Sequence, residues 1–200
     1  MRSGVAQQLK QQTAAAHARV ETFLALEDPE LSADRLRDVL ARFAGFWQGT
    51  ERLVDEWAAA RPELAEALNW PRRRRREVLR ADLLRLGLSV REITALPEAP
   101  AVFTDLDDAD VLGWLYVSEG ATLGGAVIDR TLRALPGGDR LRTFTPYLEG
   151  PGPMWRSFLA VLADWVGDDP DRQARVVRAG VGTFTALERW LAPLAGEDAA

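Results

Sequence analysis

The stretch VLGWLYVSEGATLGGAVIDRTL, residues 111–132, is the feature that most restricts how this chain can fold. Its apolar residues recur every three to four positions, which is the period of a buried helix. Gly120, Gly124 and Gly125 interrupt it, although each glycine inside a helix costs about 1 kcal/mol relative to alanine. Gly120 and Gly124 are one turn apart and leave one face of the backbone bare, and the Gly-Gly pair predicts a kink. The stretch is therefore a kinked helix that either packs tightly on another helix or admits a bulky ligand close to its main chain.

Helical periodicity also dominates the rest of the 200-residue chain, whereas the alternation typical of strands is nearly absent. Ser32 is a favourable N-cap, and Pro71 and Pro170 suit the first turn of a helix. Long helices are expected over residues 3–26, 32–61, 71–86, 105–134, 153–166 and 170–191. We predict an all-α fold in which residues 1–200 form a single domain, with a frayed tail over 195–200.

The composition excludes several classes of function. The chain has no cysteine, which removes disulfides and thiolate metal sites, and its one histidine cannot supply a di-iron site built from two Glu-x-x-His motifs. A net charge of −5 is unlike that of a general nucleic-acid binder. No apolar run approaches the roughly 20 residues that span a bilayer, and the N-terminus has no signal-peptide pattern. We expect a cytoplasmic protein that binds neither nucleic acid nor membrane.

Five consecutive arginines, Arg72 to Arg76, stand out in the expected helix 71–86. Such a run is usually a solvated helix face. It could also form a docking patch for an acidic partner, such as a small electron carrier. The sequence leaves both interpretations open.

The only histidine, His17, lies among small residues in the segment LKQQTAAAHARVETF. Small neighbours leave room for a large planar ligand above the imidazole. Glu21 is one turn further along the same helix face, where its carboxylate could hydrogen-bond Nδ1 and leave Nε2 free for iron. Lys10 is two turns back, about 10 Å along the axis, and could pair with an anionic group at the ligand edge. Alternatively, His17 is an ordinary surface or core histidine, and Glu21 and Lys10 are simply solvated.

Three sets of residues together resemble the haem oxygenase family, in particular the bacterial type associated with bacteriophytochromes. The first is the pattern L-K-x-x-T-x-x-x-H-x-x-x-E over residues 9–21. The second is L-Y-V-x-E-G-x-T-L-G-G-x-V-I over 115–128. The third combines aromatic and glycine positions over 146–158 with T-F-x-x-L-E-x-W-L over 183–191. They span most of the chain, and the middle pattern is the most specific.

The resemblance implies that haem is sandwiched between a proximal helix and the kinked, glycine-rich distal helix. His17 would be the proximal axial ligand of the haem iron, and Glu21 would orient it. Gly120, Gly124 and Gly125 would be the catalytic residues of the distal helix, with their backbone close over the iron.

The resemblance also assigns residues to the edges of the haem. Lys10 and Tyr116 would contact the propionates, Arg156 matches a position that often carries a basic propionate partner, and Phe184 would pack near the haem edge. One departure is Ala121, which occupies a position where some family members have an aspartate that holds a water network. Protons would then arrive through water held by the backbone or by another side chain, such as an arginine.

The activity implied by the resemblance is oxidative cleavage of haem b, which is both cofactor and substrate, by O₂ into biliverdin, CO and ferrous iron. The chain has no nucleotide-binding or iron–sulfur motif, so the electrons would come from an external donor such as a ferredoxin or a reductase. A bacteriophytochrome would be a possible recipient of the biliverdin. Two alternatives remain at this point: a haem-binding carrier or sensor without turnover, and a helical interaction module whose glycines serve only packing.

Overall fold

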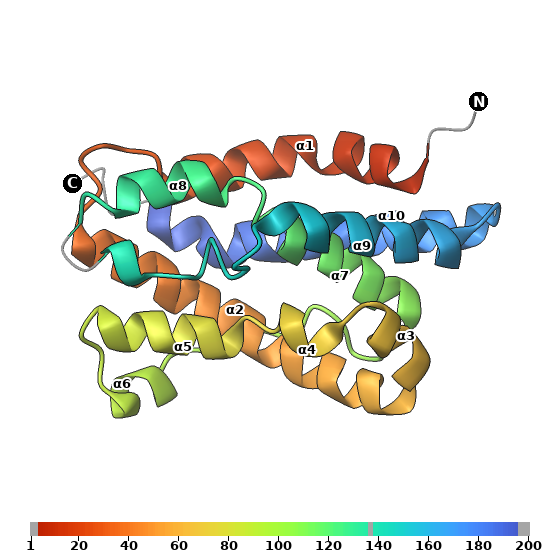
Figure 1. The fold of residues 1–200 in the computed structure, drawn as a ribbon, viewed down its shortest axis with the longest axis horizontal. Helices are drawn as coiled ribbons and strands as arrows, with labels where there is room; N and C mark the ends of the chain where they lie inside the picture. The colour runs from red at the N-terminus through yellow and green to blue at the C-terminus, as the bar shows by residue number, and fades with distance from the viewer. Residues whose placement is uncertain (1–3, 136–137, 196–200) are drawn as a thin grey trace.

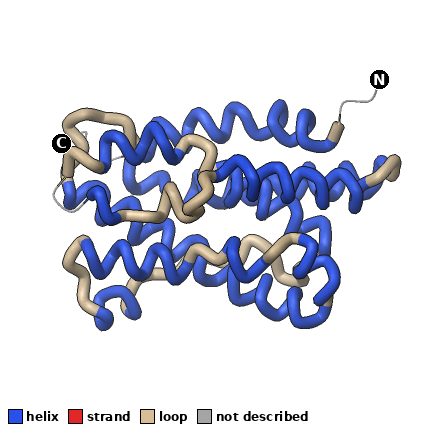
Figure 2. The backbone as a smooth tube through the Cα atoms, in the orientation of Figure 1, coloured by secondary structure: helices blue, strands red, loops and turns tan. Residues whose placement is uncertain are grey.

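Residues 4–135 and 138–195 are described by the computed structural model, and all regular structure in them is helical (Figure 2). The α-helices are α1 (Val5–Leu24), α2 (Ala33–Ala60), α3 (Pro62–Ala67), α4 (Trp70–Arg73), α5 (Arg76–Arg85), α6 (Val90–Thr94), α7 (Asp108–Gly120), α8 (Gly125–Leu132), α9 (Pro151–Val166) and α10 (Pro170–Leu191). Two short 3₁₀ helices, η1 (Gly138–Arg140) and η2 (Ala192–Ala195), complete the described elements. The all-α prediction is confirmed.

The helices are arranged around α7 and α10 (Figure 1). In that view α1 and α8 form the upper edge, α9 and α10 cross the middle, and α2 to α6 form the lower edge. The close crossing of α7 and α10 depends on Gly113, because a Cβ there would lie 2.5 Å from the Ala179 side chain. Trp114 and Leu115 of α7 are completely buried, so this helix is the centre of the hydrophobic core.

Helix α7 begins with a capping box, in which the Asp107 carboxylate accepts hydrogen bonds from the backbone N–H groups of Ala109 and Asp110. The Asp110 carboxylate in turn accepts one from the N–H of Asp107. Such reciprocal bonds satisfy N–H groups that a helix start leaves unpaired. They fix where the glycine-bearing stretch begins.

The predicted helix over 105–134 is two helices with a kink between them. Helices α7 and α8 meet at an angle of 44° across a break of four residues, 121–124. Short turns bridge the break, since the N–H of Leu123 bonds to the carbonyl of Gly120 and that of Gly125 to Thr122. The glycine-rich segment therefore bends the chain between α7 and α8 while turns keep it locally folded.

The arginine run is the place where the sequence interpretation was wrong. The expected helix over 71–86 is divided into α4 and α5, and the run is not a solvated face. Arg73 is completely buried and Arg75 is 4% exposed, because both side chains turn inward to the buried carboxylate of Glu119 on α7. Arg72 pairs with Glu149, and Arg74 pairs with Asp55. Each of these charges has a partner within the chain, so the run does not form a free docking patch.

The expected frayed tail over 195–200 lies outside the described residues except for Ala195. That residue ends η2, whose Leu194 is buried, so helical structure continues past Pro193. Within the described part of the chain, no single helix is long and apolar enough to span a membrane; only the bent pair α7 and α8 passes that test of length and composition.

Candidate functional site

His17 is held at the surface of α1 by contacts with two elements. Its side chain is 48% exposed, and its Nδ1 lies 3.3 Å from a carboxylate oxygen of Glu21, one turn further on. The ring meets that of Phe184 on α10 edge-on, with 5.7 Å between the centroids. Because Nδ1 faces Glu21, Nε2 is the nitrogen left to bind a metal, which is the usual arrangement of a ligating histidine.

The Arg19–Glu188 pair fixes the position of α1 against α10 next to this histidine. Two parallel hydrogen bonds of 2.6 and 2.9 Å join the Arg19 guanidinium to the Glu188 carboxylate. The pair is exposed, so it adds little stability. Its two-point geometry nevertheless restrains how the helices can rotate relative to one another.

His17 and Gly120 occupy matching positions on neighbouring helices. The Thr13 side chain on α1 lies near enough to the Tyr116 hydroxyl on α7 to lower its pKa, so the two helices approach each other here. His17 is four residues after Thr13, and Gly120 is four residues after Tyr116, so each lies one turn beyond this contact. Helix α1 and the α7–α8 pair run in the same direction across the molecule (Figure 1). The imidazole and the bare backbone of Gly120 are therefore on adjoining surfaces.

The α7–α8 bend carries an open, apolar stripe. A Cβ added at Gly120 or at Gly124 would meet nothing within 4 Å. Leu123 and Val127 share the stripe and are 45% and 46% exposed, which is unusual for large apolar side chains. Space above a glycine backbone, bordered by exposed apolar side chains, is what a flat apolar ligand would cover.

Gly125 lies on a different face from the other two glycines. It is buried, and a Cβ there would lie 2.0 Å from the carbonyl oxygen of Phe144. The structure therefore brings Gly120 and Gly124 to the open stripe and uses Gly125 for close packing of α8 on the segment after η1.

The residues expected at the propionates lie on three helices, with Lys10 on α1, Tyr116 on α7 and Arg156 on α9. The Tyr116 ring packs at 5.6 Å against Trp155 of α9, the neighbour of Arg156 in the chain. Burial raises the pKa of the Tyr116 hydroxyl, and the nearby Thr13 side chain partly offsets that effect. Lys10 and Arg156 are both exposed. Tyr116 is thus close to α1 and to α9, the helices that carry the two cations, and both cations are accessible to anionic groups of a ligand.

A buried ion cluster anchors α7, and no sequence pattern indicated it. Glu119 is completely buried and lies 2.7 Å from a guanidinium nitrogen of Arg73 and 3.1 Å from one of Arg75. The Tyr147 hydroxyl donates a 2.7 Å hydrogen bond to the same carboxylate, and burial raises the pKa of Tyr147. Arg73 also donates to the carbonyl of Met154 on α9. Because Glu119 precedes Gly120, this cluster fixes which face of α7 the glycine presents.

A small cavity of about 30 Å³ lies beneath the bend, lined by Ser118, Ala121, Arg75 and aromatic residues of α2. Two of the residues that line it have a buried polar atom without a hydrogen-bond partner in the described part of the chain, namely Ser118 Oγ and Arg75 Nη1. A space of this size can hold a water molecule, and such a water needs polar partners. Sequence reasoning missed both residues, because a serine in an apolar run and an arginine in a basic run carry no distinctive pattern.

Together these features suit a large, flat, apolar ligand that carries anionic groups and a metal ion. His17 offers a nitrogen ligand, the stripe of Gly120 and Gly124 offers backbone and apolar contact, and Lys10 and Arg156 offer positive charge. These are the demands of haem. The residues present fit the group that the sequence led us to expect.

Comparison with known proteins gives a consistent result. The sequence profile of a protein family described as "Heme oxygenase" matches residues 3–192. The chain is 34% identical over 151 residues to "Heme oxygenase PigA" of Pseudomonas aeruginosa, covering 73% of this chain and 71% of that protein. It is 34% identical over 140 residues to a "Heme oxygenase" of Xanthomonas campestris pv. campestris, covering 69% and 78%. The fold is similar to that of the NO- and CO-bound heme oxygenase from Neisseria meningitidis, with a TM-score of 0.70, 21% identity, and coverage of 96% and 92%.

Proposed function

The chain belongs to the haem oxygenase family, and we propose that the surface between His17 and the Gly120–Gly124 stripe is where it degrades haem. The family and its named relatives support an enzyme that cleaves haem rather than one that only carries it. The observation that best supports the location is the open backbone of Gly120 and Gly124, one turn beyond the contact that joins the His17 helix to α7. Residues 1–200 would act as a single domain.

When bound, haem supplies the iron that activates O₂ and the porphyrin that is cleaved. The residues of this chain bind and orient it. His17 would bind the iron through Nε2 while Glu21 accepts the Nδ1 proton in a hydrogen bond and fixes the ring. Lys10, Tyr116 and Arg156 would bind the propionates, and Phe184 would border the ring.

The Gly120–Gly124 stripe, which would form the distal wall of the haem site, would act through its shape and its lack of side chains. The bare backbone of Gly120 and Gly124 would leave open space beside a bound haem, and Leu123 and Val127 would limit the access of bulk water to it. Protons would come from water held between Ser118 Oγ and Arg75 Nη1 in the cavity under the bend. This water would replace an acidic side chain at Ala121.

The proposed reaction also requires an electron donor and a recipient for its product. The electrons would come from an external ferredoxin or reductase, and a bacteriophytochrome would be one recipient of the biliverdin. A cytoplasmic location likewise stays a prediction.

The direct test is a single-turnover assay. Purified protein is loaded with hemin and given ascorbate in air with catalase present, while the absorption spectrum is recorded over minutes. We expect the Soret band to disappear and a broad red band of biliverdin to grow. A stable Soret band would instead identify a carrier or sensor, and no Soret shift on hemin addition would show that the site does not bind haem.

A bulky side chain on the open stripe should slow turnover without preventing haem binding. Gly124→Leu and Gly120→Leu place a side chain where a Cβ now meets nothing within 4 Å, on the surface where haem would bind. We expect turnover to fall at least about tenfold, which corresponds to about 1.4 kcal/mol on the barrier. The Soret titration and the single-turnover assay measure both effects.

Ala126→Leu is the matched control for these variants. Ala126 is exposed on α8 and lies about 200° around the helix from Gly124. The added side chain is the same size but points away from the stripe, so turnover should change less than twofold. Normal turnover in both glycine variants would contradict the assignment of the distal wall.

Ser118→Ala tests the proposed water. Removing the hydroxyl takes away one of the two polar groups that would hold it, so proton delivery should slow. We expect turnover to fall several-fold and the solvent deuterium isotope effect on it to rise, while the Soret maximum and the urea unfolding midpoint stay the same. An unchanged rate and isotope effect would show that protons reach the site by another route.

A further inference from the structure

A second, larger cavity lies on the side of α10 that faces away from His17. Its volume is about 920 Å³, within the range of small-molecule sites. Residues 175, 178, 182, 185 and 189 of α10 line it and form one stripe at steps of three and four residues. Phe184, which touches His17, is on the opposite face of the helix. The groove is therefore separated from the haem site by the whole width of α10.

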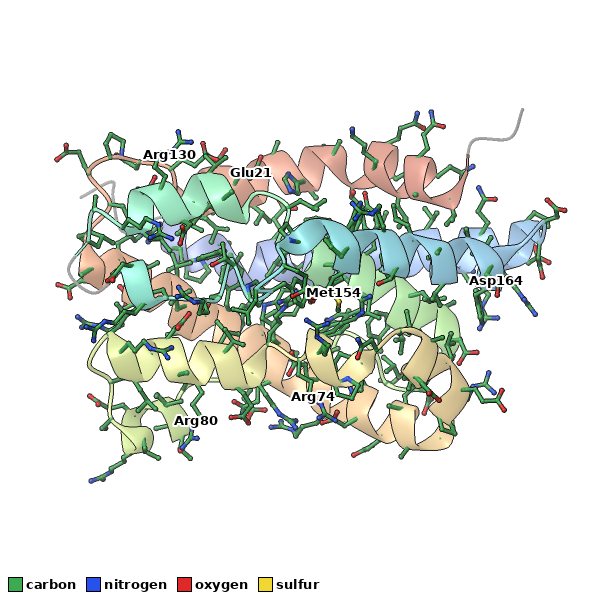
Figure 3. The ribbon with its side chains drawn as sticks, viewed as in Figure 1. Glu21, Arg74, Arg80, Arg130, Met154 and Asp164 are labelled. Atoms are coloured by element: carbon green, nitrogen blue, oxygen red, sulfur yellow. The ribbon has the colours of Figure 1, made fainter. Side chains whose placement is uncertain are left out.

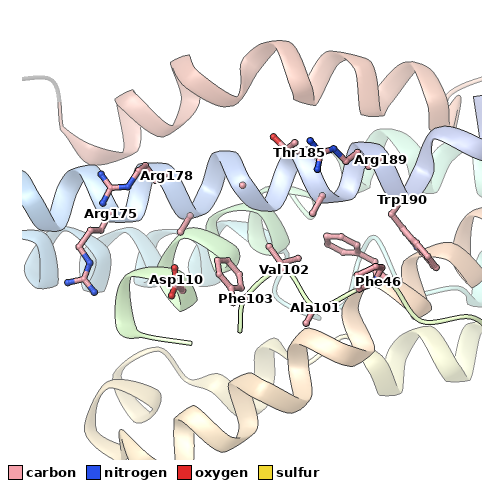
Figure 4. Close-up of a pocket in the computed structure, with 15 residues that line it drawn as sticks. Phe46, Ala101, Val102, Phe103, Asp110, Arg175, Arg178, Thr185, Arg189 and Trp190 are labelled. Carbon is pink, nitrogen blue, oxygen red and sulfur yellow. The ribbon is translucent and has the colours of Figure 1, made fainter. Parts of the chain in front are cut away.

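The walls of this groove are apolar. Phe46 of α2 is 2% exposed and forms the floor, and Val102 and Phe103 extend it along the segment that leads into α7. Figure 4 shows these residues across from α10, with Trp190 closing one end. Trp190 is held there by a 2.7 Å hydrogen bond from its indole N–H to the carbonyl of Arg42. The cavity is thus built from side chains fixed by the core, rather than from mobile surface groups.

Arginines stand at both ends of the groove (Figure 4). Arg175 is engaged by the carboxylate of Asp107. In the described part of the chain, neither Arg178 nor Arg189 has a carboxylate within 4.0 Å, although Arg189 is near enough to Glu188, the partner of Arg19, to help lower its pKa. Arg178 and Arg189 are 11 residues apart, about 16 Å along the helix axis. A long apolar space bordered by unpaired guanidinium groups is electrostatically complementary to an apolar molecule with an acidic end.

Asp110 is the acidic residue among those that line the groove, and it is already engaged. Its carboxylate accepts a 3.2 Å hydrogen bond from the backbone N–H of Asp107 as part of the α7 capping box. Burial raises the pKa of the Asp110 carboxyl above its usual range, and the nearby positive charge of Arg175 partly offsets that effect. Positive charge therefore prevails in the groove.

We propose that this groove is a second ligand site that binds an apolar carboxylate, with the acid group on Arg178 or Arg189 and the apolar part against Phe46 and Phe103. Two sources share this chemistry: a long-chain aliphatic acid, and a linear tetrapyrrole acid such as biliverdin. The proposal concerns residues outside the haem site and does not depend on haem turnover.

Isothermal titration of hemin-loaded protein with laurate, and separately with biliverdin, tests the proposal and distinguishes the two sources. Hemin fills the first site, and a constant Soret band during the titration shows that it stays filled. We expect one equivalent of laurate, of biliverdin or of both to bind. Saturable binding of laurate alone identifies an aliphatic-acid site, and binding of biliverdin alone identifies a tetrapyrrole site. No saturable binding of either would overturn the proposal.

Two variants locate the binding. The double variant Arg178→Gln/Arg189→Gln should weaken the affinity at least about tenfold, because it removes both unpaired charges. Gly182→Leu should abolish binding, because a Cβ at Gly182 meets nothing within 4 Å and the side chain enters the groove. Equal affinity in both variants would also overturn the proposal.

Arg80→Gln is the control for charge. Arg80 is exposed on α5, at the edge of the molecule opposite α1 (Figure 3), and has no ion pair within the described residues. Its loss should change the affinity less than twofold. A hemin titration of every variant, with the affinity for hemin within twofold of the original, shows that a loss of carboxylate binding is not a loss of the fold. Should Gly182→Leu fail this check, the double arginine variant still decides the question.

Discussion

His17→Ala should abolish haem turnover and remove the imidazole signature from the spectrum of bound haem. The side chain is half exposed and contacts Glu21 and Phe184 near the surface, so its loss should leave the helix intact. Alanine is also the most favourable residue inside a helix. Changes to groups that merely support a metal ligand already reduce activity by about 10- to 100-fold. Loss of the ligand itself should therefore reduce turnover by at least about 100-fold.

The measurements are the Soret maximum of hemin-loaded protein, the rate of biliverdin formation and a far-ultraviolet circular dichroism spectrum. Added imidazole should partly restore the axial signature in His17→Ala, because the small alanine leaves room for it. Glu21→Gln is the graded control, since an amide still reaches Nδ1 but stabilises the ring less, and we expect a several-fold loss. An unchanged haem spectrum in His17→Ala would disprove the ligand assignment.

Glu119→Ala should produce the largest loss of stability of any single change near the site. Glu119 is completely buried between Arg73 and Arg75, and Tyr147 donates to the same carboxylate. Removing it takes from both guanidinium groups the carboxylate that pairs with them, and breaking a buried pair in this way typically costs about 3–5 kcal/mol. The free energy of unfolding, obtained from urea denaturation of the haem-free protein, measures the loss.

An exposed ion pair provides the comparison. Glu188→Gln disrupts the pair with Arg19, where solvent screens both charges, and should change the free energy of unfolding far less. Equal losses in the two variants would show that the buried cluster does not stabilise the fold. Because Glu119 precedes Gly120, Glu119→Ala should also slow any residual turnover by releasing the orientation of the distal wall.

The helices that were predicted well are those whose ends are marked by local capping residues or prolines. Ser32 accepts a hydrogen bond from the N–H of Arg35 at the start of α2, as an N-cap serine should. Pro170 lies at the first turn of α10, and α10 ends at Leu191 as expected. In the site, the spacing of His17 and Glu21 was enough to predict that the two side chains meet.

The features that were not predicted depend on contacts between distant parts of the chain. The arginine run reads as solvent-facing, because arginine is rarely buried unless it is paired, and its partner Glu119 is more than forty residues away. The division of the helix at Arg74 follows from the inward turn of Arg73 and Arg75. The different surroundings of Gly124 and Gly125 likewise depend on a distant residue, because it is the Phe144 carbonyl that packs against Gly125.

Helix α10 lies between two proposed ligand sites, since Phe184 contacts His17 on one side and Arg189 lines the groove on the other. Any occupant of the groove that displaces or stiffens this helix changes the affinity for haem. Thermodynamic linkage then requires haem to change the affinity of that occupant by the same factor. Helix α10 is therefore the element through which the abundance of one small molecule could set how much haem the protein captures.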